Sequence, residues 1–166
     1  MRQPQAIFYM EGHRVTGAVV TGRERVSDYL NNPNSSTVEV HDATFEELLT
    51  DRQPETAARL TVLKSEISLV VPTDMGDVGV GTRVPTQPVR VELACPLYSI
   101  VGSLHHRSSD PTDLAMLLKG FNRTFVPLTE ASMRYLPNAR YDAEERVVLV
   151  NTEHLQFWGV LPHASA

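Results

Sequence analysis

Apolar and polar residues alternate along this chain in short runs that are typical of β-strands. Runs of about five residues, rich in Val, Ile, Leu and aromatic residues and bounded by turn-forming residues, predict strands that bury one face. In the first part of the chain the expected strands cover 6–10, 14–20, 37–44, 59–63 and 67–71. In the second part they cover 89–93, 97–105, 124–131, 146–150 and 155–160. The pattern therefore predicts a mainly β protein.

Each series of strands is interrupted by one short helix between its second and third strands. In the first series, Ser27 is the expected N-cap of a single helical turn that stops at Asn31. In the second series, Asp110 is expected to cap a longer helix that ends at Gly120. Residues 45–52 predict a frayed turn or an outward loop.

The two series resemble copies of one sequence. Three stretches of the first part recur in order in the second, namely 15–20 as 100–104, 38–43 as 126–131, and 63–67 as 150–155 with one residue inserted. The offset stays near 85 to 88 residues, and its small shifts are expected to fall in loops. Two copies of one unit are expected to adopt the same fold, so the fold has to be predicted for only half of the chain.

The duplication predicts the domain organisation. We expect a first repeat over 1–72, a linker rich in Gly and Pro over 73–88, and a second repeat over 89–166. Five short strands with one apolar face are stable when their sheet bends strongly into a small barrel. The predicted fold is therefore two tandem, closed, five-stranded β-barrels, each with one short helix.

The composition restricts the classes of function. A net charge of -5 over 166 residues argues against a protein whose main work is to grip phosphate backbones, because such proteins usually carry a basic face. A single cysteine excludes an intrachain disulfide. No stretch approaches the roughly 20 apolar residues of a membrane span, and the N-terminal apolar run is too short for a signal peptide. We therefore expect a cytoplasmic protein that does not enter a membrane.

No arrangement of reactive residues predicts catalysis or a metal centre. His105 and His106 are neighbours on a strand, so they point to opposite faces and do not share one ion. Cys95 lies in an apolar strand, as expected of a buried small side chain. The acid pairs 46–47 and 144–145 are expected in hydrated turns. We therefore predict a non-enzymatic protein with no catalytic residues, no cofactor and no metal.

Aromatic residues at adjacent strand positions are the strongest sign of an interaction surface. Phe8 and Tyr9 form one such pair, and Phe157 and Trp158 form the other. One side chain of each pair is expected to face outward, because successive strand residues point to opposite faces. An outward aromatic residue on a terminal strand either serves an interface between molecules or packs between the two repeats.

Three arginines are candidate contacts for nucleic acid. Arg14, Arg23 and Arg25 cluster around the first expected helical turn. Glu11 and Glu24 interleave with them, so a surface of mixed charge is the competing interpretation.

Three motifs in each repeat resemble those of the Sm-like (LSm) small β-barrel family. A strand containing Gly-x-Leu is matched by Gly17-Ala18-Val19 and by Gly102-Ser103-Leu104. A Leu-x-Asp-Ala strand is matched by Val40-His41-Asp42-Ala43 and by Leu128-Thr129-Glu130-Ala131. A polar corner before the last strand is matched by Lys64-Ser65-Glu66-Ile67 and by Asn151-Thr152-Glu153-His154-Leu155. The resemblance covers most of both repeats and leaves out the linker.

The resemblance implies self-association. The family closes rings of six or seven barrels, so three chains of two repeats would give a pseudo-sixfold ring. The family's RNA pocket uses an asparagine and an Arg-Gly pair, but the matching positions hold Thr37, Phe125, Lys64-Ser65 and Asn151-Thr152. The sequence therefore favours an assembly module that pairs through exposed edge strands, and an RNA-binding regulator is the alternative.

Overall fold

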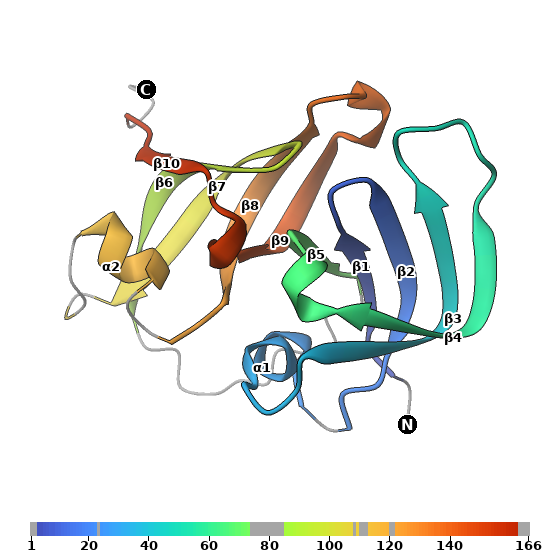
Figure 1. The fold of residues 1–166 in the computed structure, drawn as a ribbon. Coiled ribbons are helices and arrows are strands. Elements are labelled where there is room, and N and C mark those ends of the chain that lie inside the picture. The colour runs from blue at the N-terminus through green and yellow to red at the C-terminus, as the bar shows by residue number, and fades with distance from the viewer. Residues whose placement is uncertain are drawn as a thin grey trace. The chain divides into compact units, whose positions relative to one another are not determined.

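The computed structural model describes residues 3–22, 24–73, 85–107, 109, 113–119 and 122–162 (Figure 1). The chain divides into two compact units, Met1–Asp77 and Val78–Ala166, which we call unit 1 and unit 2. Most of the predicted linker, 74–84, lies outside the described residues, and its last three residues already belong to a strand that begins at Thr86.

Unit 1 consists of one antiparallel sheet and one short helix. Its elements are β1 (Gln5–Tyr9), β2 (His13–Val19), α1 (Val26–Asn31), β3 (Thr37–Glu47), β4 (Glu55–Leu63), the 3₁₀ turn η1 (Lys64–Glu66) and β5 (Leu69–Pro72). The strand order is β5-β1-β2-β3-β4. Each neighbouring pair in this order is antiparallel.

Unit 2 repeats this arrangement. Its elements are β6 (Thr86–Cys95), β7 (Tyr98–Arg107), α2 (Leu114–Lys119), β8 (Phe125–Tyr135), the 3₁₀ turn η2 (Ala139–Tyr141), β9 (Ala143–Asn151), the 3₁₀ turn η3 (Thr152–His154) and β10 (Phe157–Val160). The strand order is β10-β6-β7-β8-β9, again antiparallel throughout. The prediction of a mainly β protein is therefore confirmed.

The five-stranded sheets are open, so the prediction of closed barrels is wrong. A closed barrel requires the two end strands of a sheet to pair with each other. In the described structure β4 does not pair with β5, and β9 does not pair with β10. The 3₁₀ turns η1 and η3 separate these strands, and the four residues of β5 all pair with β1. The apolar pattern indicates which residues form strands, but whether the end strands meet depends on this corner, which the pattern does not encode.

The internal correspondence of the two units is close. From the helix onward the α-helix, the strands and the 3₁₀ turn before the last strand recur at an offset of 88 residues, as in Val26–Asn31 with Leu114–Lys119 and Leu69–Pro72 with Phe157–Val160, and only η2 has no counterpart in unit 1. The starts of β2 and β7 differ by 85 residues, and β7 has ten residues where β2 has seven. The shift therefore lies in a longer strand rather than in a loop, and the corner before the last strand contains no inserted residue.

Both sheets bend at a corresponding β-bulge. The register shifts between Thr16 and Ala18 in unit 1 and between Val101 and Ser103 in unit 2. On the facing strands, Asp42 and Glu130 adopt left-handed backbone conformations with φ of 47° and 50°. A bulge increases the local twist of a sheet, so it accounts for the strong bend in each unit.

Several predicted boundaries were displaced. The helix α1 begins at Val26 with Arg25 as its N-cap and no side-chain cap, so Ser27 does not cap it. The predicted turn at 45–52 is wrong at its start, because β3 continues through Glu47. The predicted cap Asp110 and the end at Gly120 lie outside the described residues, and α2 covers Leu114–Lys119. Neither described helix is long and apolar enough to cross a membrane.

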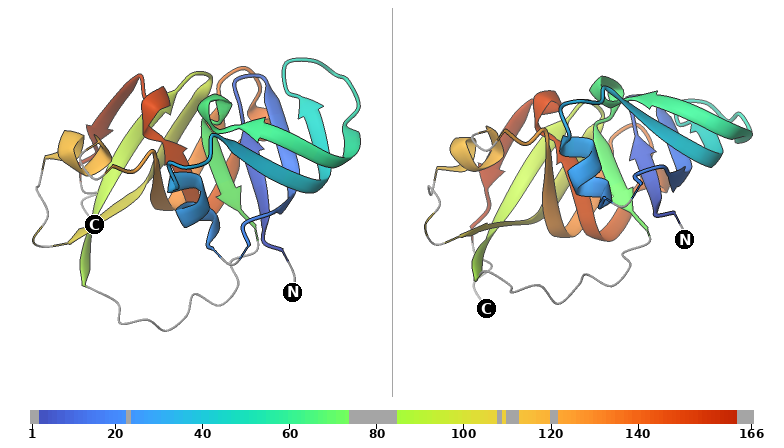
Figure 2. Two further views of the ribbon diagram at one scale, coloured as in Figure 1. Left: turned by 60° about the horizontal axis from the view of Figure 1, so that its bottom comes forward. Right: turned by 90° about the horizontal axis from the view of Figure 1, so that it is seen from below.

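Each sheet covers an apolar core. In unit 1, Phe8, Val19 and Val40 are fully buried, and in unit 2 Tyr98 and Leu128 are fully buried. Full burial of such a side chain stabilises the fold by about 1.5–3 kcal/mol. In Figures 1 and 2, α1 lies beside the corner that leads into β5, where it covers one end of the unit 1 sheet.

Candidate assembly interface

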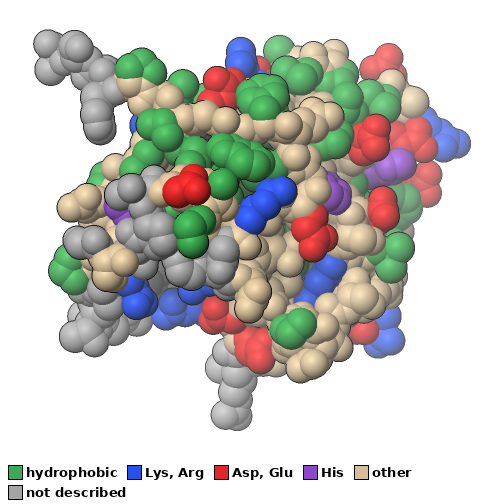
Figure 3. Space-filling model, turned by 60° about the vertical axis from the view of Figure 1, so that its left-hand side comes forward, with side chains coloured by type: hydrophobic (Ala, Val, Ile, Leu, Met, Phe, Trp, Pro, Cys, Tyr) green, Lys and Arg blue, Asp and Glu red, His purple; other side chains and the backbone are tan. Residues whose placement is uncertain are grey.

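The strand β10 carries exposed apolar side chains. Phe157 is 57% exposed and Val160 is 60% exposed, although both belong to a strand that pairs with β6. Trp158 is half-buried, and the Nζ of Lys119 lies 5.4 Å from the centre of its ring. Figure 3 brings the α2 side of Figure 1 forward and shows hydrophobic side chains gathered among charged ones on that face. Exposed apolar groups of this kind mark an interaction surface.

The corresponding strand of unit 1 is buried. Leu69 and Val70 are 0% exposed and Val71 is 1% exposed, whereas Phe157 and Trp158 occupy the same positions of the repeat as Leu69 and Val70. The same element of the repeat is therefore covered in one unit and uncovered in the other.

A second pair of corresponding strands shows the reverse assignment. In unit 2 the last four residues of β9, Val148–Asn151, are all buried. In unit 1 the corresponding end of β4 is only partly buried: Val62 is 4% exposed, but the last residue, Leu63, is 52% exposed. Among the strands that the structure describes, β4 pairs with β3 alone and β10 with β6 alone. Both exposed strands therefore have a free edge of backbone hydrogen-bonding groups.

Only one of the two predicted aromatic pairs reaches the surface. Phe8 is 0% exposed and Tyr9 is 2% exposed, so the expectation that one of them faces outward is wrong. Their strand, β1, pairs with β2 on one side and with β5 on the other, which makes it an interior strand of the sheet. Adjacent residues of an interior strand are both buried when both faces of the sheet are covered. Phe157 and Trp158 remain as candidates.

The arginine cluster is already engaged in part. The guanidinium of Arg14 forms an ion pair with the carboxylate of Glu46, its cross-strand neighbour in the β2–β3 register. Arg25 is exposed at the start of α1, and Arg23 lies outside the described residues.

Reactive side chains do not converge in the described part of the chain. No group of three or more His, Cys, Asp or Glu residues lies close enough together there to hold a metal ion. His106 is 8% exposed and His105 is exposed, as expected for opposite faces of a strand. Burial raises the pKa of the Cys95 thiol to about 12, which keeps it in the unreactive thiol form.

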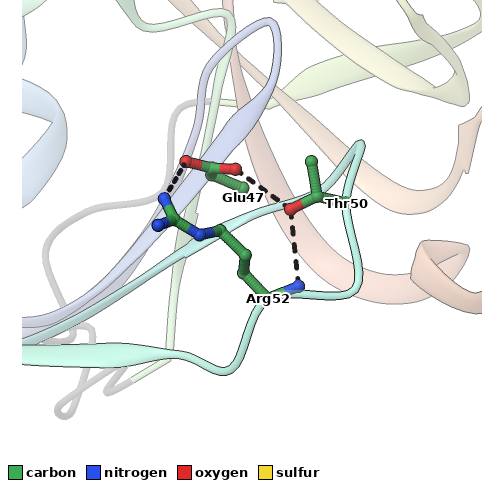
Figure 4. A network of polar contacts seen from close by, with 3 residues as sticks. All are labelled: Glu47, Thr50 and Arg52. Carbon is green, nitrogen blue, oxygen red and sulfur yellow. Dashed lines mark hydrogen bonds and ion pairs between the residues drawn. The ribbon is translucent and has the colours of Figure 1, made fainter.

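The acid pairs lie in strands rather than in turns. Residues 46–47 end β3, and residues 144–145 belong to β9. Glu47 accepts a hydrogen bond from the Thr50 hydroxyl at 3.0 Å, which lowers the pKa of its carboxyl, and Arg52 binds its other oxygen (Figure 4). Burial raises the pKa of Glu145. The network of Glu47 fixes the loop after β3 and has an evident structural role.

A buried lysine fixes the helix of unit 1. Lys64, at 9% exposure, donates hydrogen bonds from Nζ to the backbone oxygens of Tyr29 and Asn32 at 2.8 and 3.1 Å. These carbonyls lie at the end of α1, where four carbonyls lack helical partners. Removal from water lowers the pKa of Lys64, and the charge of Glu24 opposes this effect.

The sequence did not indicate Leu63 as a surface residue. Its apolar character predicted only a strand residue, and the insertion that the sequence comparison wrongly placed at the corner obscured its correspondence with Asn151. The uninterrupted offset of 88 residues aligns the two positions, and the contrast between an exposed Leu63 and a fully buried Asn151 then becomes visible.

Comparison of the chain with protein families, with curated proteins and with solved structures found no match.

Proposed function

We propose that this protein is a non-enzymatic assembly module whose copies associate through the exposed edge strands β4 and β10. The observation that carries the proposal is the unequal burial of corresponding strands. The last strand of the repeat is buried in unit 1, where it is β5, and carries exposed apolar residues in unit 2, where it is β10. The end of the preceding strand is buried in unit 2, where it is β9, and carries the exposed Leu63 in unit 1, where it is β4. A second copy of the chain offers strands that match both exposed edges.

The exposed side chains support this use. Three of the large hydrophobic residues that are exposed in the described structure, Leu63, Phe157 and Val160, lie on these two strands. Burying about half of a Leu or Phe side chain contributes about 1–1.5 kcal/mol, and backbone pairing along the edge adds to it. An edge that is neither blocked nor paired is a template for another strand.

The assembly forms a ring or a filament, according to the rotation between successive copies. The resemblance to Sm-like barrels favours a closed ring of three chains, with a mass three times the 18.5 kDa of one chain. RNA binding, the alternative, has less support, because Arg14 is paired with Glu46 and unit 1 carries the whole acidic excess of the chain.

Light scattering on purified protein tests the proposal. Leu63→Asp and Phe157→Asp place a charge at the two edges, and we expect each to weaken association by roughly 100-fold, since a buried unpaired charge is costly. Leu49→Asp and Leu136→Asp are matched controls, because these residues are 59% and 65% exposed in loops outside the two edge strands. We expect the controls to keep the mass of the unaltered protein.

Equal masses for the edge variants and the loop variants would contradict the proposal. Nuclease treatment gives the second comparison. A mass that falls after nuclease digestion, together with retention on RNA that decreases steeply with salt, would favour the RNA-binding alternative instead.

A further inference from the structure

We infer that the joint between copies is head-to-tail, with β10 of one copy on the segment Leu60–Leu63 of β4 of a second copy, anchored by Leu63 and Phe157. This inference depends on the proposed self-association and adds which edges meet, in which register, and which side chains select the partner.

The position of the joint follows from the buried part of β9. Its residues Val148–Asn151 are all buried, whereas Ala143–Val147 are exposed or half-buried. The corresponding segment of β4 is Leu60–Leu63. This segment is four residues long, which is also the length of β10. The exposed strand and the segment that it would cover are therefore matched in length.

The register follows from the direction of pairing. Every strand pair in both units is antiparallel, so we expect an antiparallel joint. Full overlap of the two four-residue segments then places Phe157 opposite Leu63 and Trp158 opposite Val62. In this register Phe157 and Leu63, which are both exposed, lie on the same face, and the buried Val62 meets the half-buried Trp158. On Leu60–Leu63 of β4 the more buried and the exposed positions alternate, as expected of a strand with one covered face, and the exposed Val160 of β10 lies opposite the half-buried Leu60 on the second face.

The anchoring residues differ from their counterparts in the repeat. Position 63 holds leucine where β9 has Asn151, and position 157 holds phenylalanine where β5 has Leu69. Asn151 is 0% exposed and its Oδ1 accepts a hydrogen bond from the backbone N–H of Glu153 at 3.0 Å, so it serves its own corner. Leu63 and Phe157, on the exposed edges, are thus together larger and more apolar than their counterparts Asn151 and Leu69. We expect this difference to select the intermolecular partner.

Repeat-swap variants test the anchors. Leu63→Asn and Phe157→Leu give each exposed edge the residue that the other copy of the repeat uses, so the folded unit tolerates them. We expect each to raise the dissociation constant of the assembly about tenfold, because each removes apolar area from the joint. Leu49→Asn is the control, and we expect it to leave the dissociation constant unchanged.

Disulfide mapping tests the direction. In a Cys95→Ala background, one preparation carries Leu63→Cys and another carries Phe157→Cys. Cβ atoms of directly opposed strand residues lie about 4.5–5.5 Å apart, within reach of a disulfide with slight adjustment. We expect a crosslinked pair only when the two preparations are mixed, and several-fold less product when Thr56→Cys, at the other end of β4, replaces Leu63→Cys.

The outcomes distinguish the head-to-tail joint from self-association itself. Crosslinking of either preparation with itself would overturn the head-to-tail joint, since it would require like edges to meet. An oligomer that forms no mixed crosslink, or that crosslinks equally well through Thr56→Cys, would overturn the register while leaving self-association intact. A monomer in every preparation would instead remove the proposed function itself.

Discussion

Gly17 lies at the β-bulge of unit 1, where the structure leaves no room for a side chain. A Cβ atom there would lie 2.6 Å from Cγ1 of Val40 and 2.7 Å from the backbone oxygen of His41. At Gly102, the corresponding position of unit 2, the nearest atom would be Cβ of Leu128 at 3.0 Å. Ordinary carbon contacts lie at about 3.5–4.0 Å, so both positions are tight and the first is severely so.

We therefore expect Gly17→Ala to destabilise the protein by about 2–4 kcal/mol and Gly102→Ala by about 1 kcal/mol. The first substitution forces a backbone oxygen to move, whereas the second needs a shift of a few tenths of an ångström. Alanine also lowers the conformational entropy of the unfolded chain relative to glycine. This effect stabilises the folded state and offsets roughly 0.4–1 kcal/mol of the cost of each substitution.

Urea unfolding, followed by far-UV circular dichroism, measures the difference. The fluorescence of the single tryptophan, Trp158, reports unit 2 separately. All samples are compared at one protein concentration, because association shifts the apparent stability. A cost for Gly17→Ala no larger than that for Gly102→Ala would refute the reasoning from these contacts.

Three further predictions concern single side chains. Glu130→Gly relieves the left-handed backbone at φ 50° and stabilises unit 2 by about 0.5–1 kcal/mol in urea unfolding, whereas Glu130→Val, with a β-branched side chain, destabilises it. Lys64→Met removes the two hydrogen bonds to the end of α1 and lowers the free energy of unfolding by about 1–3 kcal/mol, and unchanged stability would contradict that role. The pKa of Cys95 is about 12 in the folded chain against 9.0 for a free thiol, so its contribution to stability is complete below pH 9 and is lost as the pH rises toward 12. Urea midpoints between pH 8 and 10 should therefore fall more for the unaltered protein than for Cys95→Ala, and parallel profiles would count against this burial.

Much of the fold was predictable from local patterns. Val38 and Val40, alternating with polar neighbours, predicted β3, and the recurrence of 38–43 as 126–131 predicted that both repeats share one fold. Whether each sheet closes into a barrel was not predictable. It depends on the direction that the corner after β4 gives to the four-residue strand that follows. The end of β3 was missed because Glu46 and Glu47 are polar on both faces, and their places in the strand are held by Arg14 and by the loop after β3.

The candidate site was predictable only in part. The adjacent aromatic residues Phe157 and Trp158 indicated an exposed strand, but the same reasoning applied to Phe8 and Tyr9 failed. Sequence alternation distinguishes the two faces of a strand and does not indicate whether both faces are covered. That difference depends on the position of β1 inside the sheet order, which only the structure gives.

Sedimentation velocity on the unaltered protein across a range of micromolar concentrations tests the central claim most directly. The free edges of β4 and β10 predict a species of at least two chains that grows with concentration or persists as one closed oligomer. A single sedimenting species of 18.5 kDa at every concentration would contradict it.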